Sequence, residues 1–285
     1  MNFIYLWIRA GYKYLYHGMN QLLIKRKQYK SINIPLREIL RLQAAPYKLN
    51  TETILFGKKI KINSPFWYLF GLKEIYFEKH YFFESTNCVP YIIDCGSNIG
   101  LGIIFFKKMF PDAKIIGFEP DPAIYKLLEH NISVFGFENV EVYQKAVWVN
   151  NNAISFKSDG AVGGSIRLLE KTNEYSLDKI EAVRLRDLLA NSVIDFLKID
   201  IEGAEFDVIK DCRDVLKNAN NIFIEYHSVV EKEQRIDELL NILKSTGFRV
   251  YIKEAWNILD HPFTNHPDLA FDLQLNIFAY KKQSF

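Results

Sequence analysis

The sequence predicts an α/β fold, a doubly wound and mostly parallel sheet preceded by an accessory α+β region. From Tyr91 onward, short apolar runs alternate with helix-like stretches, which is typical of a sheet with helices on both faces. The first two apolar runs end in Asp94 and Glu119, and a glycine turn follows the first run. Residues 1–85 lack this alternation, so we predict an accessory region with an N-terminal helix there and the sheet domain at 86–285.

The accessory region contains three recognisable elements. A short helix is expected after Pro35, in the segment KSINIPLREILRLQ. The segment TILFGKKIKIN predicts a hairpin that turns at Gly57, because Ile60 and Ile62 alternate with lysines. The aromatic stretch 66–84 is compatible with a helix.

The sheet domain is expected to contain seven strands with helices between most of them. The expected strands are 91–95, 114–120, 139–147, 193–200, 221–227, 248–254 and 273–282. The expected helices are 98–110, 121–136, 202–218 and 230–247, with Asp121 near the cap of the second and Gly247 closing the last. A long loop joins the last two strands, which suits an antiparallel pair at the edge of the sheet.

Composition is that of an ordinary globular protein, with 49% apolar and 25% charged residues. The net charge of +2 gives no whole-molecule argument for binding nucleic acid. Residues 1–30 contain six of the 36 basic residues and no acidic residue, so a basic N-terminus precedes a mildly acidic body. Three cysteines, Cys88, Cys95 and Cys212, lack metal-ligand spacing, and their odd number suits a reducing, cytoplasmic compartment.

The N-terminus has an amphipathic pattern rather than that of a membrane span. No stretch reaches the roughly 18 apolar residues that a span requires, and the basic start of a secretory signal is absent. Phe3, Trp7, Ala10 and Tyr14 fall near helical spacing. Such a helix either packs on the body or on a partner subunit, as in a homodimer, or lies on the inner face of the membrane, with its lysines toward anionic lipid.

The segment DCGSNIG predicts the cofactor. A dinucleotide site favours GxGxxG, whereas here a GxxxG turn follows Asp94, and an acid in the turn repels a pyrophosphate. The acid suits the cationic end of S-adenosylmethionine, whose carboxylate can bind free amides at the helix start. Glu119 would bind the ribose hydroxyls, and Ala146 would flank the adenine. The expected cofactor-binding residues are Asp94, Gly96, Ser97, Asn98, Gly100, Glu119, Ala146 and Asp200.

Four segments carry a resemblance to a known family. IIDCGSNIG, GFEP, FLKIDIEGAE and IFIEYH resemble the FkbM-type group of class I S-adenosylmethionine-dependent methyltransferases, over about residues 91–252. FLKIDIEGAE is the most specific segment, since all class I enzymes share the glycine turn. The resemblance implies a Rossmann-like sheet of seven strands and methyl transfer, commonly to a hydroxyl of a sugar, polyketide or similar metabolite. Residues 1–85 lie outside it, and we expect them to carry much of the substrate choice.

Acidic residues and a histidine end the fourth and fifth expected strands. Asp200 and Glu202 end FLKIDIEG, while Glu225 and His227 end IFIEYH two residues apart, on one face of the strand. A hydroxyl acceptor benefits from a base, and we expect Asp200, His227 and Glu225 to act in catalysis, with His227 or Asp200 as the base. Alternatively, Asp200, Glu225 and His227 hold Mg²⁺, which lowers the pKa of the acceptor. Glu202 could instead cap the following helix.

The Gly-rich loop 158–167 is expected to be mobile and to contact either ligand, or else to be a simple surface loop. The candidates are Ser158 and Asp159 for the adenine, and Ser165 and Arg167 for the acceptor. His80 and Tyr81 could wall the acceptor pocket, although core packing suits them better.

Several functions compete at this point. The favoured one is an O-methyltransferase acting on a sugar, a glycan precursor or a similar small metabolite. The alternatives are a scaffold that binds S-adenosylmethionine without turnover, and a methyltransferase acting on a polyketide or peptide metabolite. A nucleic-acid methyltransferase is disfavoured, because the chain lacks an NPPY-like tetrapeptide and a long basic stripe in its catalytic half. The glycine spacing disfavours a nicotinamide oxidoreductase.

Overall fold

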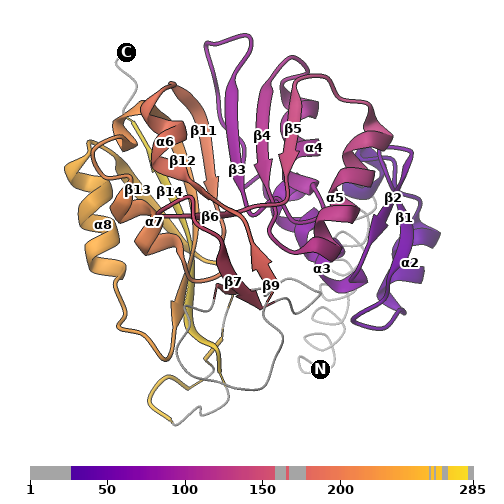
Figure 1. Cartoon of the computed structure of the whole chain (residues 1–285). Helices are drawn as coiled ribbons and strands as arrows, with labels where there is room; N and C mark the ends of the chain where they lie inside the picture. Colours follow the sequence, from indigo (N-terminus) through magenta and orange to yellow (C-terminus); the bar gives the residue numbers. More distant parts are fainter. Residues whose placement is uncertain are drawn as a thin grey trace, which may run out of the picture. The chain divides into compact units, whose positions relative to one another are not determined.

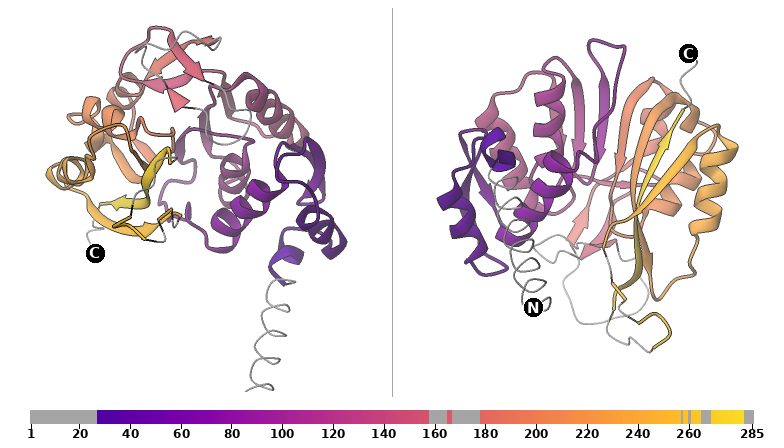
Figure 2. Two further views of the ribbon diagram at one scale, coloured as in Figure 1. Left: turned by 90° about the horizontal axis from the view of Figure 1, so that it is seen from below. Right: turned by 180° about the vertical axis from the view of Figure 1, so that it is seen from behind.

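The computed structural model describes residues 27–157, 165–166, 178–256, 258–259, 261–264 and 269–281 (Figures 1 and 2). The chain divides into two compact units, Met1–Lys73 and Glu74–Phe285. The domain boundary that we place after residue 85 stays a prediction. Across the described part of the chain, no helix has both the length and the apolar character needed to cross a membrane.

The first unit confirms the expected α+β accessory part. Its elements are α2 (Leu36–Gln43), β1 (Thr51–Leu55), β2 (Lys58–Ile62), α3 (Pro65–Gly71) and the start of a π-helical segment (Leu72–Phe77). β1 and β2 pair as the expected hairpin, and Ile60 and Ile62 are fully buried, which explains their alternation with exposed lysines. The side chain of Ser64 accepts the Trp67 amide and so caps α3.

The second unit is built on a seven-stranded sheet in the order β13-β14-β12-β11-β3-β4-β5. Its strands are β3 (Tyr91–Cys95), β4 (Lys114–Phe118), β5 (Val140–Tyr143), β11 (Ile194–Ile199), β12 (Ala219–Val229), β13 (Arg249–Glu254) and β14 (Phe271–Tyr280). Neighbours from β12 to β5 pair in parallel, whereas β14 pairs antiparallel with both β12 and β13. The expected antiparallel pair is therefore confirmed at one edge of the sheet (Figure 2).

Helices cover this sheet along its length. They are α4 (Leu101–Met109), α5 (Pro122–Phe135), α6 (Leu185–Ala190), α7 (Glu205–Asp211) and α8 (Ile236–Ser245), with a short 3₁₀ turn at Leu216–Asn218. Figure 1 shows α4 and α5 beside β3 to β5, and α6 to α8 beside the other half of the sheet. As expected, Asp121 caps α5, because its side chain accepts the amides of Ala123 and Ile124.

The expectation of one continuous strand at 139–147 is wrong. A turn in which the Lys145 amide donates to Tyr143 O separates β5 from β6 (Ala146–Trp148). β6 leaves the main sheet and pairs in parallel with β10 (Ala182–Arg184). A further small sheet consists of β7 (Ile154–Lys157), β8 (Ser165–Ile166) and β9 (Asp178–Ile180).

The two-residue alternation of β3 and β11 decides which side chains reach the site. Ile93 and Leu197 point into the large core that also contains residues of α7 and α8. Asp94 and Lys198 are cross-strand neighbours on the other face. An aromatic cluster fills that face below them, and it consists of Tyr81, Phe83, Phe106, Phe196 and Phe223. The carboxylate of Asp94 and the ammonium group of Lys198 therefore lie together on one side of this aromatic cluster.

Candidate active site

The glycine turn after β3 brings the ends of three strands together. The amides of Gly96 and Ser97 both donate to Phe118 O at the end of β4, at 2.9 and 2.8 Å. Gly96 has φ +83°, and a Cβ atom there would lie 1.8 Å from Asp200 O at the end of β11. No side chain fits this position, so Gly96 is required for the approach of β3 to β11.

Asp94 lies at the base of this turn with a buried carboxylate. Its exposed fraction is 1%, and neither carboxylate oxygen accepts a hydrogen bond from any described residue. Its ion-pair partner is Lys198, whose Nζ lies 3.3 Å from Oδ1. A buried carboxylate with free acceptor positions is costly, and the charge of Lys198 compensates part of this cost. The contact of Asp94 with the cofactor stays a prediction.

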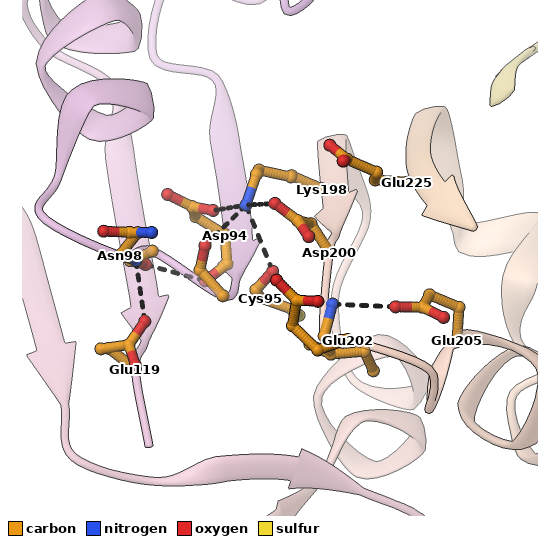
Figure 3. A network of polar contacts seen from close by, with 12 residues as sticks. Asp94, Cys95, Asn98, Glu119, Lys198, Asp200, Glu202, Glu205 and Glu225 are labelled. Carbon is orange, nitrogen blue, oxygen red and sulfur yellow. Dashed lines mark hydrogen bonds and ion pairs between the residues drawn. The ribbon is translucent and has the colours of Figure 1, made fainter. Parts of the chain in front are cut away.

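Lys198 joins the turn to the carboxylates (Figure 3). Its Nζ donates to Gly96 O at 2.6 Å and lies 3.3 Å from both Asp94 Oδ1 and Asp200 Oδ2. Burial lowers the pKa of Lys198, but the carboxylates of Asp94 and Asp200 outweigh burial and hold its pKa well above the usual value. Lys198 is therefore a permanent cation at the centre of the site.

Glu119 follows β4 and faces the same turn. Its carboxylate accepts the amides of Asn98 and Asp121 at 2.9 and 3.0 Å. Burial raises the pKa of Glu119 to about 7, although these two hydrogen bonds oppose the shift. The two oxygens keep further acceptor positions, which suits the two hydroxyls of a ribose.

The remaining residues expected to bind the cofactor lie around the turn, except Ala146. Ser97 Oγ donates to Asp94 O, and Gly100 adopts φ +91° directly before α4. Asn98 also has a positive φ, at +48°. Ala146 is buried at the start of β6, and its amide donates to Glu181 O. Its contact with an adenine stays a prediction.

His227 lies in a ring of carboxylates. Its Nδ1 is 3.1 Å from Glu205 Oε1, and its Nε2 is 3.6 Å from Glu202 and 3.7 Å from Glu225. Burial lowers the pKa of His227, but the charges of Glu202, Glu205 and Glu225 outweigh burial, and its pKa lies well above the usual value. A histidine with a raised pKa balances these charges and is less well suited to act as a base near neutral pH. The catalytic role of His227 stays a prediction.

Glu225 and Asp200 are the more accessible carboxylates of the group. Their side chains are 23% and 25% exposed. Asp200 directly follows β11, and Glu225 lies within β12, directly after the part of β12 that pairs with β11. Burial, followed by the charge of Asp200, raises the pKa of Glu225 to about 8. A carboxylate with a pKa near working pH is well matched to proton transfer.

One set of ligand atoms in the described residues is compact enough for a metal ion. Atoms of Asp200, Glu202 and His227 lie within 4.8 Å of one another. The sequence suggests Asp200, Glu225 and His227 as metal ligands, whereas the compact set in the structure contains Glu202 instead of Glu225. Metal binding requires a neutral imidazole, and the raised pKa of His227 opposes it. The Mg²⁺ site stays a prediction.

The remaining candidates pack against other aromatic side chains or lie outside the described residues. Tyr81 packs edge-on against Phe223 in the aromatic cluster, and His80 packs on Phe278. Of the 158–167 loop, Ser158, Asp159 and Arg167 lie outside the described residues, as does the N-terminal helix, and only the backbone of Ser165 is described.

Sequence reasoning missed two residues, Lys198 and Glu205. Lys198 precedes Asp200 by two positions, and a lysine inside an apolar parallel strand needs an anionic partner, which was a usable signal. Glu205 is fully buried and accepts the amides of Ile201 and Gly203, the role that we considered for Glu202. The sequence does not show whether Glu202 or Glu205 is the buried carboxylate, because this depends on the conformation of the loop before α7.

Comparisons with known proteins identify the family of this chain. The model of the methyltransferase FkbM domain family matches residues 94–250. The chain is 24% identical over 204 residues to Methyltransferase 1 of Beauveria bassiana, covering 64% of this chain and 81% of that protein. It is 28% identical over 198 residues to Methyltransferase sdnD of Sordaria araneosa, covering 58% and 75%. It is 27% identical over 176 residues to 2-O-methyltransferase NoeI of Sinorhizobium fredii, covering 55% and 72%.

Among solved structures, the chain is similar to a methyltransferase FkbM from Methylobacillus flagellatus, with 16% identity and a TM-score of 0.46. That alignment covers 69% of this chain and 45% of the other. The family model, in contrast, covers more than half of this chain, from the acid of the glycine turn to β13. This protein therefore belongs to the FkbM methyltransferase domain family, a group of class I S-adenosylmethionine-dependent methyltransferases.

Proposed function

We propose that this methyltransferase acts on oxygen, and that its acceptor is a hydroxyl of a sugar, a glycan precursor or a similar small metabolite. The observation that carries the proposal is Glu225, a partly exposed carboxylate with a pKa raised to about 8 beside Asp200. Such a group takes up the proton that a hydroxyl loses on methylation. A relative named 2-O-methyltransferase supports the same direction.

The residues of the turn fit S-adenosylmethionine. Asp94 has a buried carboxylate with free acceptor positions for an ammonium group. Gly96 leaves no space for a side chain, which keeps the turn close to Asp200 at the end of β11. Glu119 offers acceptor positions to the ribose diol. When bound, this cofactor supplies a methyl group activated by a sulfonium charge.

The chain's own residues then have separate tasks. Asp94, Gly96 and Glu119 would hold the donor. Asp200 and Glu225 orient the acceptor hydroxyl, and such positioning supplies much of the rate of a displacement at carbon. When bound, the donor would supply its methyl group to the acceptor oxygen and would keep the electron pair of the carbon–sulfur bond. The hydroxyl proton passes to the Glu225 carboxylate.

The first unit supports an acceptor that is held at a membrane, as the basic N-terminus suggests. Of its 73 residues, 13 are Lys or Arg and two are Glu, whereas the second unit contains 23 basic and 32 acidic residues. All nine basic side chains at 27–73 are exposed, and so are Leu36 and Leu40, one turn apart on α2. Positive charge beside exposed leucines suits an anionic lipid surface. This would place the protein in the cytoplasm, on the inner face of the membrane.

The proposal is tested with methyl-labelled S-adenosylmethionine and a fractionated cell extract. Label is expected in the carbohydrate fraction, and a scaffold without turnover would label no fraction. Transfer chiefly to protein or RNA would contradict the proposed acceptor. Sedimentation with phosphatidylcholine vesicles, with and without phosphatidylglycerol, tests the lipid contact separately, and equal binding to both vesicles would contradict it.

A further inference from the structure

Tyr81 is the polar member of the aromatic cluster, whose other members are phenylalanines. The centroid of its ring lies 4.9 Å from that of Phe223 and 5.8 Å from that of Phe106. The residue is 6% exposed, so these contacts cover most of the ring. A phenylalanine would pack in the same way, and the hydroxyl of Tyr81 therefore needs an explanation of its own.

The backbone before β3 fixes the place of this ring. The His80 amide donates to Glu74 O at 3.1 Å, and the Phe82 amide donates to Lys79 O at 3.0 Å. Lys79 adopts φ +57°, a left-handed conformation that is typical of a tight turn. Tyr81 lies inside this turn, so the backbone holds it on both sides.

The register of the sheet places charged groups next to the ring. Lys198 of β11 pairs with Phe223 of β12, and two residues further along the chain lie Asp200 and Glu225. Side chains two residues apart in a strand share a face, so Glu225 follows Phe223 on the face that Tyr81 covers. Lys198 Nζ lies 6.0 Å from the centroid of the Tyr81 ring. The ring therefore borders the charged groups at the carboxyl ends of the strands.

The Tyr81 hydroxyl faces these charged groups and has no hydrogen-bond partner in the part of the chain that the structure describes. Burial raises the pKa of Tyr81 well above its usual value, and the charge of Lys198 opposes the shift. The charges of Asp200, Glu225 and Asp94 act on the hydroxyl in decreasing order, and no hydrogen bond contributes. The hydroxyl therefore keeps its proton and remains a donor. A tyrosine hydroxyl in a buried position usually finds a partner, and one that lacks it in the free protein suits a ligand.

A ligand can reach this hydroxyl. The unpartnered atoms that are sealed from solvent, such as the carboxylate oxygens of Asp94, do not include it. The side chains of Asp200 and Glu225 are 25% and 23% exposed. A group bound between these two carboxylates would lie beside the hydroxyl of Tyr81.

We propose that the Tyr81 hydroxyl donates a hydrogen bond to the acceptor oxygen and so orients the group that is methylated. This role rests on the proposed function, in which the proton of the acceptor hydroxyl passes to Glu225. An alcohol oxygen has two lone pairs, so it can accept from Tyr81 with one and present the other to the methyl carbon. Its oxygen–hydrogen bond breaks toward the Glu225 carboxylate, and Tyr81 keeps its own proton. An amine nitrogen has a single lone pair and cannot do both, so Tyr81 favours oxygen over nitrogen.

Tyr81→Phe tests the role, because it removes the hydroxyl and keeps the ring. The initial rate of methyl transfer from labelled S-adenosylmethionine to the carbohydrate fraction should fall by about 10- to 100-fold, the effect of losing one positioning hydrogen bond. The dissociation constant of S-adenosylhomocysteine, measured by calorimetry, should stay close to the wild-type value. The melting temperature should also be kept, since the free protein loses no bond.

Tyr76→Phe is the matched control. Tyr76 is also buried and packs against Phe105, but its hydroxyl donates to Leu101 O at 2.9 Å. Its loss should lower the melting temperature and leave the transfer rate of the folded protein unchanged. An equal drop in melting temperature for Tyr81→Phe, or its failure to fold, would show that the Tyr81 hydroxyl has a structural partner, and would overturn the inference.

The remaining outcomes separate this inference from the proposed function. An unchanged transfer rate for Tyr81→Phe, with an active wild type, would reject the inference alone. A loss of affinity for S-adenosylhomocysteine as large as the loss of rate would place the hydroxyl against the cofactor, and would also reject it. If the wild type itself transferred no label to the carbohydrate fraction, the proposed function would be wrong and the inference would fall with it.

Discussion

Lys198 of β11 and Asp94 of β3 are cross-strand neighbours, and their charged groups lie 3.3 Å apart at the carboxyl ends of both strands. This pair joins the glycine turn, which faces the expected cofactor, to Asp200, which faces the expected acceptor. Figure 3 shows Lys198 at the centre of this network, between Asp94 and Asp200. Its members respond to substitution and to pH in different ways.

Gly96→Ala should prevent stable folding of the site. The new Cβ would collide with Asp200 O, so we expect destabilisation by more than about 3 kcal/mol, in the range of severe core disruption. Gly136→Ala is the control, since Gly136 also has positive φ but an open surrounding, and it should cost about 1–2 kcal/mol. Denaturant unfolding measures both, and similar losses for the two variants would contradict the close approach of β3 to β11.

Glu119 should make cofactor binding dependent on pH near neutrality. Its pKa is raised to about 7, so the carboxylate that accepts ribose hydroxyls is present above that pH and is lost as pH falls through it. Affinity for S-adenosylhomocysteine should therefore strengthen between about pH 6 and pH 8. Calorimetry on Glu119→Gln should show weaker binding without this rise. An unchanged rise in the variant would assign the titration to another group.

Removing the charge of Glu119 should also change stability with a definite sign. A buried carboxyl whose folded-state pKa exceeds its unfolded value makes the protein less stable as pH rises from about 4.5 to about 7. Glu119→Gln should gain stability relative to the wild type over this interval. Thermal unfolding at several pH values measures the difference, and a constant difference would show that Glu119 does not titrate there.

Glu225 should control the rate of transfer. The base must be ionised to accept a proton, so kcat should rise with pH to a plateau above about 8. Glu225→Gln should lower kcat by about 10²–10⁴-fold with little change in cofactor affinity. His227→Asn tests the alternative base. If His227→Asn removed the pH dependence and Glu225→Gln kept it, His227 would be the base.

Asn276 lies opposite Glu225 on β14, and its buried amide makes no hydrogen bond with the described residues. Replacing an unsatisfied polar group by an apolar one of similar shape is neutral or stabilising. Asn276→Leu should therefore keep or raise the melting temperature, by about 2–4 °C per kcal/mol gained. Asn131→Leu, which loses the bond to Ile99 O, should lower it. A lower melting temperature for Asn276→Leu would contradict this prediction, because it would mean that the Asn276 amide has a hydrogen-bond partner in the free protein.

Much of the fold follows from local pattern. Apolar runs and caps such as Asp121 predicted the elements of the parallel half, because a buried strand and a capped helix are local signals. The break after Tyr143 was missed, since β6 pairs with β10, which lies more than thirty residues away. Pairing between distant segments leaves no local trace in one sequence.

The site, too, was predictable from the sequence only in part. The acids at strand ends were predictable, because strands of a parallel sheet end at one edge. The raised pKa of His227 was not predictable, since it depends on the charges of Glu202 and Glu205, and Glu205 turns inward only through the loop before α7. The raised pKa of Glu225 likewise depends on burial and on Asp200, which no spacing reveals.

The most direct test of the proposed function is the carbon NMR spectrum of the product formed with ¹³C-methyl S-adenosylmethionine and the carbohydrate fraction. A methyl resonance in the methoxyl region, absent with Glu225→Gln, is the result that oxygen methylation at this site predicts. Label found only on nitrogen or carbon, or a methoxyl signal of equal strength with Glu225→Gln, would contradict it.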